Sequence, residues 1–246
     1  MRGILTYHSV DPSGSAISIS EHELRQHIRF FASRRVQIVP LEWLHKVPAD
    51  RDALAITFDD GFQNFADVAW PLFKHNDLPV TLFVPTERLG GRNDWGGTKH
   101  KGIPELPLMS WETVAKLVEH GLTLGSHSRT HPHLETLDDA GIERELAGSA
   151  DDIEKRTGAR PKAFCYPFGT FDERCVAVAR KHYEVAVTTE LAALPDAAGA
   201  PDLHRLPRLD AYYWRGDGLE RWGTGSFRRR IAFRALARRV RATFGG

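Results

Sequence analysis

The sequence predicts an α/β protein whose strands form one parallel β-sheet. Short apolar runs rich in β-branched residues alternate with segments of helical spacing along the 246 residues. Most of these runs are apolar throughout, which is typical of parallel strands covered by helices. Serine and glycine residues stand where the helical segments would begin and end. Together these features indicate repeated βα units in a single sheet, in a chain short enough for one domain.

Eight runs are predicted as strands because they are short, apolar and bounded by turn residues. They are residues 3–7, 36–39, 54–58, 80–84, 122–125, 163–166, 184–188 and 206–209. Such a set fits either a closed barrel or an open doubly wound sheet, and periodicity does not separate these two arrangements.

Five segments between the strands are predicted as helices. Ser20, followed by Glu23, has the spacing of a capping box, and Ser110 opens another helix in a similar way. Gly121 and Gly158 stand where C-terminal caps are expected. The predicted helices are residues 21–33, 64–75, 111–120, 138–157 and 171–181.

The composition excludes several classes of protein. With 41% apolar residues the chain is neither disordered nor fibrous. No apolar run approaches the roughly 18 residues that a membrane span needs. Cys165 and Cys175 cannot form a disulfide framework. Basic charge is concentrated in the C-terminal segment, whereas a nucleic-acid binder usually spreads it over a folded face, so we expect no nucleic-acid partner.

The first candidate site directly follows the strand at residues 54–58. Asp59 and Asp60 are adjacent and precede Gly61. Two carboxylates at the end of a buried strand are costly unless a cation neutralises them. They point in different directions, so one can bind a metal while the other faces the substrate. The alternative is an aspartate that caps the next helix.

The second candidate site follows the strand at residues 122–125 and holds His127, His131 and His133. One helical turn from Ser128 would bring His127 and His131 to the same side, a spacing that suits two imidazoles on one cation. One carboxylate and two imidazoles leave coordination positions open for water and substrate, unlike a closed structural zinc site. The carboxylate of Asp59 would then be free to act as a hydrolytic base.

These motifs resemble those of the polysaccharide deacetylase family, also called carbohydrate esterase family 4 or the NodB homology domain. Residues 57–61 match its T-F-D-D-G signature letter for letter, and residues 127–131 match its H-[ST]-x-x-H signature. The resemblance extends over most of the chain, from about residue 3 to residue 210. It implies a distorted (β/α) barrel of about seven parallel strands, with the active site at their C-terminal ends. It also implies a metal-dependent hydrolase that removes acetyl groups from N-acetylated sugars.

The resemblance also implies a role for each matching residue. Asp59 is the general base for the attacking water, and Asp60, His127 and His131 hold one divalent metal ion. Zinc is the expected ion, with cobalt, nickel and manganese as alternatives, because imidazole and carboxylate ligands suit them all.

The family's third motif corresponds to residues 165–169, of which the Pro-aromatic-Gly part is kept. The backbone N–H of Phe168 is implied to help form the oxyanion hole, with Tyr166 beside it. The arginine that usually supports the catalytic aspartate is replaced by Cys165. We expect Arg208, in the last predicted strand, to hold Asp59 instead, and a surface arginine before a turn is the alternative. If Arg208 has this role, Arg208→Ala lowers turnover far more than stability.

The chain also departs from the family at the general acid. The family's usual acid is a histidine in an L-x-H motif, but His204 directly follows Leu203 and lies ahead of the last strand. His8 ends the first predicted strand, where a barrel places its active site. A leaving amine must gain a proton, and an imidazole suits that task near neutral pH. We therefore expect His8 to lie in the site, and it is the candidate for the acid, whose identity the sequence leaves open.

Substrate recognition is predicted to involve aromatic residues. Trp95 lies in the long segment 90–107, and long ordered loops are often functional. It is a candidate platform for a sugar, as are Tyr212, Tyr213 and Trp214 just after the last strand. Packing in the core or in a lid is the alternative for each.

We expect a barrel domain over residues 1–212 and an arginine-rich, helical extension over residues 213–246. Residues 227–244 combine apolar residues with seven arginines, which is typical of basic helices on anionic membrane surfaces. A terminal helix packed on the barrel is the alternative. The chain does not open with a charged segment followed by an apolar stretch, so we expect a cytoplasmic protein, at the inner face of the membrane if this helix binds there.

Two other functions stay open beside the deacetylase hypothesis. Two histidines and one carboxylate also describe the non-haem iron oxygenases, although these are usually built on antiparallel β scaffolds and have no need of Asp59. A carbohydrate-binding module that kept the fold and lost turnover is the other, because Cys165 and His204 depart from the family pattern.

Overall fold

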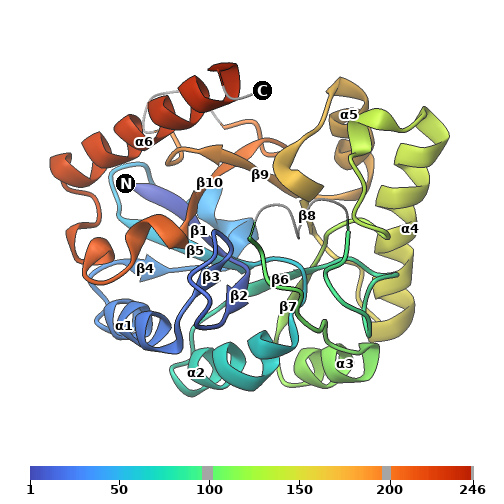
Figure 1. Cartoon of the computed structure of the whole chain (residues 1–246), viewed down its shortest axis with the longest axis horizontal. Helices are drawn as coiled ribbons and strands as arrows, with labels where there is room; N and C mark the ends of the chain where they lie inside the picture. Colours follow the sequence, from blue (N-terminus) through green and yellow to red (C-terminus); the bar gives the residue numbers. More distant parts are fainter. Residues whose placement is uncertain (96–101, 196–200, 245–246) are drawn as a thin grey trace.

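Seven parallel strands close into a barrel surrounded by helices (Figure 1). Around the barrel the order is β1, β10, β9, β8, β7, β6 and β5, and β5 pairs again with β1 along its whole length. The computed structural model describes residues 1–95, 102–195 and 201–244. The strands of the barrel are β1 (Arg2–Tyr7), β5 (Ala53–Phe58), β6 (Thr81–Val84), β7 (Thr123–Ser126), β8 (Ala163–Cys165), β9 (Val185–Leu191) and β10 (Leu206–Asp210).

The closed barrel confirms the fold class and excludes the open doubly wound sheet. All eight predicted strands are present, with bounds that differ from the prediction by three residues or fewer. The eighth, β4 (Gln37–Ile38), pairs with the first residues of β5 only, so it lies beside the ring of seven. A small separate ribbon of β2 (Ser9–Val10) and β3 (Ser18–Ile19) follows β1.

The helices follow the predicted segments closely. At the start of α1 the Ser20 hydroxyl accepts the N–H of Glu23, and the Glu23 carboxylate accepts the N–H of Ser20, so the capping box is confirmed. Gly158 ends α4 in the left-handed conformation, with a φ of 77°. A π-helical turn at Phe65–Ala69 leads into the short α2. The helices are α1 (Glu21–Ala32), α2 (Trp70–His75), α3 (Trp111–Glu119), α4 (Asp139–Thr157), α5 (Glu173–His182) and α6 (Gly225–Phe244).

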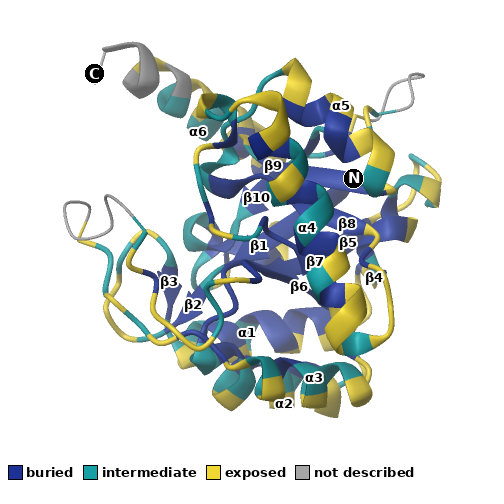
Figure 2. Cartoon of the chain, turned by 90° about the vertical axis from the view of Figure 1, so that its right-hand side faces the viewer, coloured by how far each residue is buried: buried dark blue, intermediate teal, exposed yellow. Residues whose placement is uncertain are grey.

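Alternate strand residues face the inside of the barrel and the covering helices, as the two-residue period of a strand requires. One buried cluster contains Ala53 and Ala55 of β5, Ala163 and Cys165 of β8, and their neighbours inside the barrel. Figure 2 shows the strands as a buried interior enclosed by partly exposed helices. Both faces of each strand are therefore covered, which explains why the strand sequences read as continuous apolar runs.

The segment after residue 212 takes part in the main core. Its buried apolar residues are Trp214, Leu219, Trp222, Phe227 and Ile231. Trp214 and Phe227 stack with ring centroids 4.1 Å apart. The first half of α6 thus packs on the barrel, as expected if α6 is a terminal helix packed on the barrel. Among the described residues, no helix combines the length and the apolar character needed to cross a membrane.

Candidate active site

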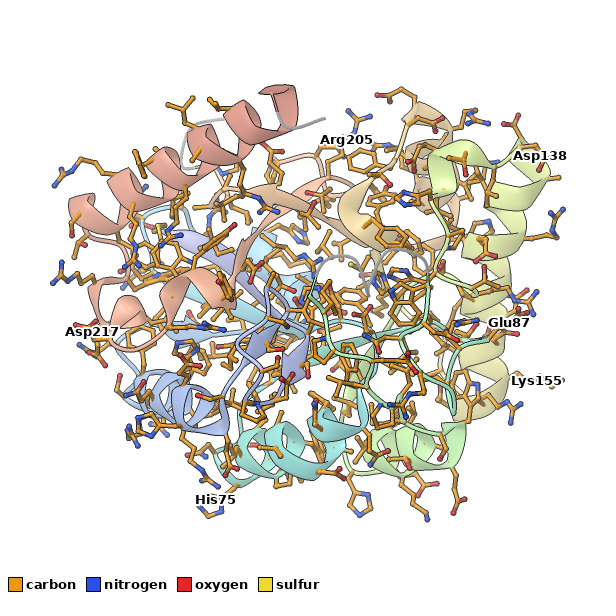
Figure 3. The ribbon with its side chains drawn as sticks, in the orientation of Figure 1. His75, Glu87, Asp138, Lys155, Arg205 and Asp217 are labelled. Atoms are coloured by element: carbon orange, nitrogen blue, oxygen red, sulfur yellow. The ribbon has the colours of Figure 1, made fainter. Side chains whose placement is uncertain are left out.

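The residues singled out in the sequence converge at one end of the barrel, where the parallel strands have their C-terminal ends. Figure 3 shows side chains crowding this central region, while the labelled Asp138, just before α4, and Lys155, on α4, lie at the outside of the molecule. A pocket opens here between the strand ends and the loops that follow them. It is lined by His8, Ile17, Asp59, Asp60, Asn93, Trp95, Ile103, His127, His131, Tyr166, Phe168, Thr189 and Arg208.

Asp59 is held in a buried ion pair with Arg208. The two guanidinium nitrogens Nη1 and Nη2 donate to Oδ1 and Oδ2 of Asp59 at 2.7 and 2.8 Å, a bidentate arrangement. Both side chains are almost completely buried. Arg208 also donates through Nε to the carbonyl of Thr188 at 2.8 Å, so its position is fixed from β9 as well as from β10. The arginine proposed to replace the family's usual partner therefore lies where that role needs it.

The ion pair decides the charge of Asp59. Burial alone would raise the pKa of this carboxyl, but the Arg208 guanidinium, with a smaller contribution from His8, holds the pKa well below its usual range. Asp59 is thus a carboxylate at neutral pH. A base must be ionised before it can accept a proton, and this contact keeps it so.

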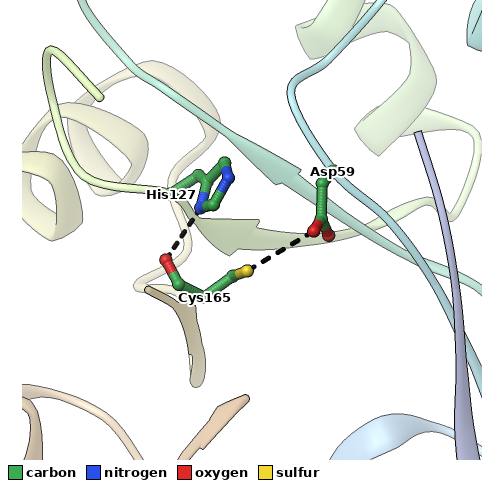
Figure 4. Close-up of side chains that lie close together, drawn as sticks. All are labelled: Asp59, His127 and Cys165. Carbon is green, nitrogen blue, oxygen red and sulfur yellow. Dashed lines mark hydrogen bonds between the residues drawn. The ribbon is translucent and has the colours of Figure 1, made fainter. Parts of the chain in front are cut away.

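Cys165 connects the carboxylate side of the site to the imidazole side (Figure 4). Its thiol lies 3.6 Å from Oδ2 of Asp59, and its backbone carbonyl accepts a hydrogen bond from Nδ1 of His127 at 2.7 Å. Because a carbonyl can only accept, Nδ1 of His127 carries a proton, and Nε2 is the atom that faces Asp60. Burial opposes a charge on this imidazole, but the neighbouring Cys165 and Asp60 raise its pKa well above the usual range, so a cation bound at Nε2 would take the place of a proton. A histidine that binds a metal through one ring nitrogen commonly donates from the other to a backbone carbonyl, and that hydrogen bond fixes the orientation of the ring.

Asp60, His127 and His131 form a compact set of ligand atoms. Oδ1 of Asp60 lies 3.4 Å from Nε2 of His127 and 3.5 Å from Nε2 of His131. Two ligands of a tetrahedral ion, each at about 2.1 Å, lie about 3.4 Å apart, so these residues fit a divalent cation such as zinc. Burial and the neighbouring His127 lower the pKa of His131 to about 3, which keeps its imidazole neutral, as a ligand must be.

The backbone around the histidines differs from the prediction of one helical turn. Ser128 and His131 have φ values of 66° and 62°, in the left-handed region, and no helix includes residues 127–131. The Ser128 hydroxyl accepts the N–H of His131 at 3.1 Å and so closes a tight turn. The expected helix was wrong because this side chain satisfies the backbone locally, yet the turn still brings both imidazoles to one side.

His8 lies at the edge of the pocket, between the base and solvent. Its Nε2 is 3.7 Å from Oδ2 of Asp59, and its side chain is 22% exposed. It follows β1 directly, as predicted. An imidazole in this place can exchange protons with solvent and with groups in the pocket.

The remaining predicted residues occupy the opposite wall. Phe168 has a φ of 57° and packs edge to face against His131, with ring centroids 4.5 Å apart. Trp95 stacks on the His131 ring, with ring centroids 4.3 Å apart. Tyr166 is fully buried, and its hydroxyl donates to the carbonyl of His204 at 3.1 Å. Tyr166 thus supports the pocket wall, with its hydroxyl turned toward β10.

Several candidates lie outside the pocket. His133 is half exposed and stacks on Phe168 at 4.1 Å, away from the ligand set. His204 is bonded through Nε2 to the carbonyl of Tyr183 at 2.9 Å, and it does not line the pocket where a general acid would act. The aromatic residues just after the last strand lie beside α6. Arg234 of α6 stacks over Tyr213 and Arg230 over Trp214, and Tyr212 precedes them in the chain.

Four pocket residues were not anticipated from the sequence: Ile17, Asn93, Ile103 and Thr189. Thr189 lies in β9 near its C-terminal end, so the rule that places barrel sites at strand ends could have found it. Asn93 is buried and accepts the N–H of Leu106 at 2.6 Å, which pins the two arms of the 90–107 segment together. Ile17 and Ile103 come from separate loops and carry no sequence signal. Residues 96–101 of this segment lie outside the described residues.

Comparison with known proteins agrees with this geometry. Residues 46–186, more than half of the chain, match the sequence model of the family described as "Polysaccharide deacetylase". The chain belongs to the polysaccharide deacetylase family. It is therefore a hydrolase of the class that removes acetyl groups from N-acetylated carbohydrates, in a metal-dependent family.

Relatives and solved structures support the assignment. YxkH of Bacillus subtilis, whose name places it among the polysaccharide deacetylases, is 26% identical over 82% of this chain and 70% of its own length. The poly-β-1,6-N-acetyl-D-glucosamine N-deacetylase of Staphylococcus epidermidis is 24% identical over 78% of this chain and 67% of its own. The structure of the Streptococcus pyogenes deacetylase PplD in complex with acetate superposes with a TM-score of 0.72, at 21% identity, over 89% of this chain and 96% of that one. The shared fold is thus clear at low sequence identity.

The family assignment favours the hydrolase over both alternatives. An iron oxygenase would have no use for the buried pair of Asp59 and Arg208. A binding module without activity would not need an ionised carboxylate beside an intact ligand set, because keeping two buried charges is costly.

Proposed function

We propose that this deacetylase hydrolyses its amide substrate with Asp59 as general base, with Asp60, His127 and His131 as metal ligands, and with His8 as general acid. One observation carries the proposal: the two adjacent carboxylates diverge. Asp60 faces the two imidazoles, whereas Asp59 is turned toward Arg208 and His8. A site for metal-assisted hydrolysis needs this separation between the ligand and the base.

The proton transfers follow from the positions of Asp59 and His8. Asp59 accepts one proton from the water that attacks the acetyl carbonyl carbon. The carbon–nitrogen bond then breaks, and the amine nitrogen receives a proton from His8. The products are acetic acid, which ionises to acetate, and the free amino sugar. Asp59 then releases its proton and His8 takes one up, so atoms and charge balance. A cation in the Asp60–His127–His131 site supplies Lewis-acid polarisation of the carbonyl.

We propose zinc as the physiological ion. Two imidazoles and one carboxylate with open positions are the ligand set of catalytic zinc sites, and the 3.4–3.5 Å separations suit its short ligand distances. Cobalt, nickel and manganese accept the same ligands, so metal reconstitution is the deciding measurement.

The aromatic wall supports a carbohydrate substrate. Trp95 and Phe168 both pack on His131 and line the pocket, so the pocket offers aromatic rings next to the ligand set. The C–H faces of a sugar ring pack well on such surfaces. The relative from Staphylococcus epidermidis is named for a β-1,6-linked N-acetylglucosamine polymer, so we propose oligomers of N-acetylglucosamine as the first substrates to test. A cytoplasmic location, expected from the sequence, stays a prediction.

The proposal is tested by acetate release from metal-stripped protein reloaded separately with zinc, cobalt, nickel or manganese. The substrates are N-acetylglucosamine oligomers and UDP-N-acetylglucosamine. Asp59→Asn should bind one metal per chain and release no acetate, whereas His131→Gln should lose both the metal and the activity. Metal-independent release, or full activity in Asp59→Asn, would overturn the assignment of the base.

The role of His8 is tested separately. His8→Gln should keep the metal stoichiometry and lower turnover on amides. An activated acetate ester does not need its leaving group protonated, so hydrolysis of such an ester should fall much less. Equal loss on both substrates, or no loss on either, would show that His8 is not the acid.

A further inference from the structure

Helix α6 carries apolar residues on two opposite faces. Phe227 and Ile231, four residues apart, are buried against the barrel. Phe233, Leu236 and Val240, spaced by three and four residues, are 73%, 61% and 47% exposed. At about 3.6 residues per turn the second set lies on the side of the helix turned away from the barrel. We call these three residues the outer stripe.

The outer stripe is unusual for the surface of this protein. Among the described residues only one other large apolar side chain, Trp43, is strongly exposed, and it lies in the 3-10 turn Leu41–Lys46. Single exposed apolar residues are normal on a protein surface, but a line of three on one helix face indicates an interaction site. Figure 2 shows α6 as a partly exposed helix outside the buried strands.

The charge of α6 points to an anionic partner. Gly225–Phe244 contains seven arginines and no acidic residue. Arg229 is exposed and lies one turn before Phe233, on the side of the outer stripe. The outward face of α6 therefore combines apolar side chains with positive charge.

Other arginines hold α6 in a fixed orientation. Arg230 donates to the carbonyl of Tyr213 at 3.1 Å, and Arg238 donates to the carbonyl of Thr189 at 3.3 Å. Arg234 stacks over the Tyr213 ring at 4.5 Å. Together with the buried Phe227 these contacts prevent the helix from turning its outer stripe inward.

We propose that the outward face of α6 docks on an anionic phospholipid bilayer. The outer stripe enters the boundary between head groups and acyl chains, while the exposed Arg229 beside it pairs with a lipid phosphate. A nucleic acid would use the arginines but leave the outer stripe in water. A second copy of the chain would bring two helices with seven arginines each together, with no acidic residue on either. An anionic bilayer is the partner that satisfies both features.

The position of α6 connects docking with the active site. Arg238 contacts Thr189, and Thr189 lines the active-site pocket. A shallow groove bordered by Phe171, Glu190 and Ala235 continues from there to α6. The wall of the pocket at Thr189 is therefore separated from the docked face by helix α6 alone, which would hold the active site near acetylated carbohydrate at the membrane. This last step rests on the proposed function, whereas docking itself does not.

Docking is tested by co-sedimentation of the full chain with vesicles of phosphatidylcholine alone and with vesicles that also contain phosphatidylglycerol. We expect binding to the phosphatidylglycerol vesicles that weakens as salt rises. The double variant Phe233→Ser and Leu236→Ser should lower the partition coefficient about tenfold or more, because each large apolar side chain contributes to burial. Arg229→Glu should lower it as well.

Two matched controls separate the outer stripe from general surface effects. Trp43→Ser removes an exposed apolar side chain elsewhere, and Arg144→Glu makes the same charge change on the exposed side of α4; both should bind as the unchanged protein does. Acetate release from a soluble oligomer reports folding and catalysis independently of docking, and it should be unaltered in the double variant.

The proposal is wrong if the chain ignores phosphatidylglycerol vesicles, if it binds phosphatidylcholine equally well, or if the controls lose as much binding as the stripe variant. A dimer in solution that the double variant converts to a monomer would instead assign the outer stripe to contact between copies. Retention of the unchanged protein and the stripe variant alike on nucleic acid, without vesicle binding, would assign the arginines to that partner.

Discussion

At the scale of single residues, the adjacent Asp59 and Asp60 show how one short motif provides two different groups. Asp60 has a φ of 72°, and this left-handed turn sends its carboxylate toward the imidazoles. Asp59 stays in line with the end of β5 and meets Arg208. Backbone strain of this kind is common at functional sites, and here it directs the metal-ligand candidate Asp60 away from the candidate base Asp59.

Burial changes what to expect from a substitution of Arg208. The sequence alone suggested a loss of turnover far greater than the loss of stability. Because the guanidinium and its partner are both buried, Arg208→Met leaves the charge of Asp59 unpaired and should lower the free energy of unfolding by about 3–5 kcal/mol as well as abolish turnover. Chemical denaturation and acetate release measure the two effects.

A double-variant cycle distinguishes positioning from simple loss of the fold. Adding Asp59→Asn to Arg208→Met should restore much of the stability and none of the activity, since neither member of the ion pair is then charged. Arg180→Met, which breaks an exposed ion pair with Asp202, should cost less than about 1 kcal/mol and leave turnover unchanged. If the second substitution restores no stability, the two charges are not coupled.

At the scale of elements, the 3-10 turn at Pro167–Gly169 builds the aromatic wall of the site. Phe168 and Gly169 both have positive φ, 57° and 73°. A Cβ atom on Gly169 would lie 1.9 Å from Oγ1 of Thr189, which β9 holds beside the pocket. The turn can therefore lie against β9 only with glycine at this position.

Gly169→Ala should destabilise the protein by more than its backbone conformation explains. Gly14 provides the control, because its φ of 71° is nearly the same and a Cβ there would meet nothing within 4 Å. Gly14→Ala should cost about 1 kcal/mol for the positive φ alone. Denaturant unfolding should show a clearly larger loss for Gly169→Ala, together with reduced turnover. Equal losses would mean that the contact with Thr189 relaxes without cost.

At the scale of the whole molecule, His27 joins three parts of the chain that are distant in sequence. Its Nδ1 is 2.7 Å from the Tyr7 hydroxyl in β1, and its Nε2 is 2.9 Å from the carbonyl of Trp214, beyond the last strand. Burial lowers the pKa of His27 to about 4. The folded protein thus keeps this imidazole neutral.

This pKa predicts a loss of stability in mild acid. The unfolded imidazole, with a pKa of about 6.5, takes up a proton before the folded one, so His27 lowers the free energy of unfolding between about pH 6.5 and pH 4. At pH 5 the loss relative to pH 7 should reach about 2 kcal/mol. His27→Gln should remove this part of the pH dependence, whereas His22→Gln, on the exposed side of α1, should not. Denaturation curves at the two pH values measure the difference.

The C-terminal segment also acts at this scale. Residues 213–231 complete the hydrophobic core, so they belong with the barrel in packing although their composition differs from it. The sequence showed the arginines and the apolar residues of this segment. It did not show that Phe227 and Ile231 face inward while Phe233 and Leu236 face outward, because that depends on where the helix meets the barrel.

The alternation of strands and helices could be predicted from the order of residues. So could the caps at Ser20 and Gly158 and the motifs that carry Asp59, Asp60, His127 and His131. These features depend on the conformational preferences of neighbouring residues and on short spacings between residues, both of which can be read directly from the sequence. Strand ends also meet at one face of a parallel sheet, so the approximate place of the site followed from the same reasoning.

Other features depend on contacts between residues that are distant in the sequence. Closure of the barrel depends on pairing between β1 and β5, about fifty residues apart. The contact of Arg208 with Asp59 joins residues 149 positions apart, and the pocket residues Ile17 and Ile103 come from unrelated loops. Such contacts arise when distant strands close and their loops pack together. No local pattern specifies them, because the free energy that selects them comes from burial in the complete fold.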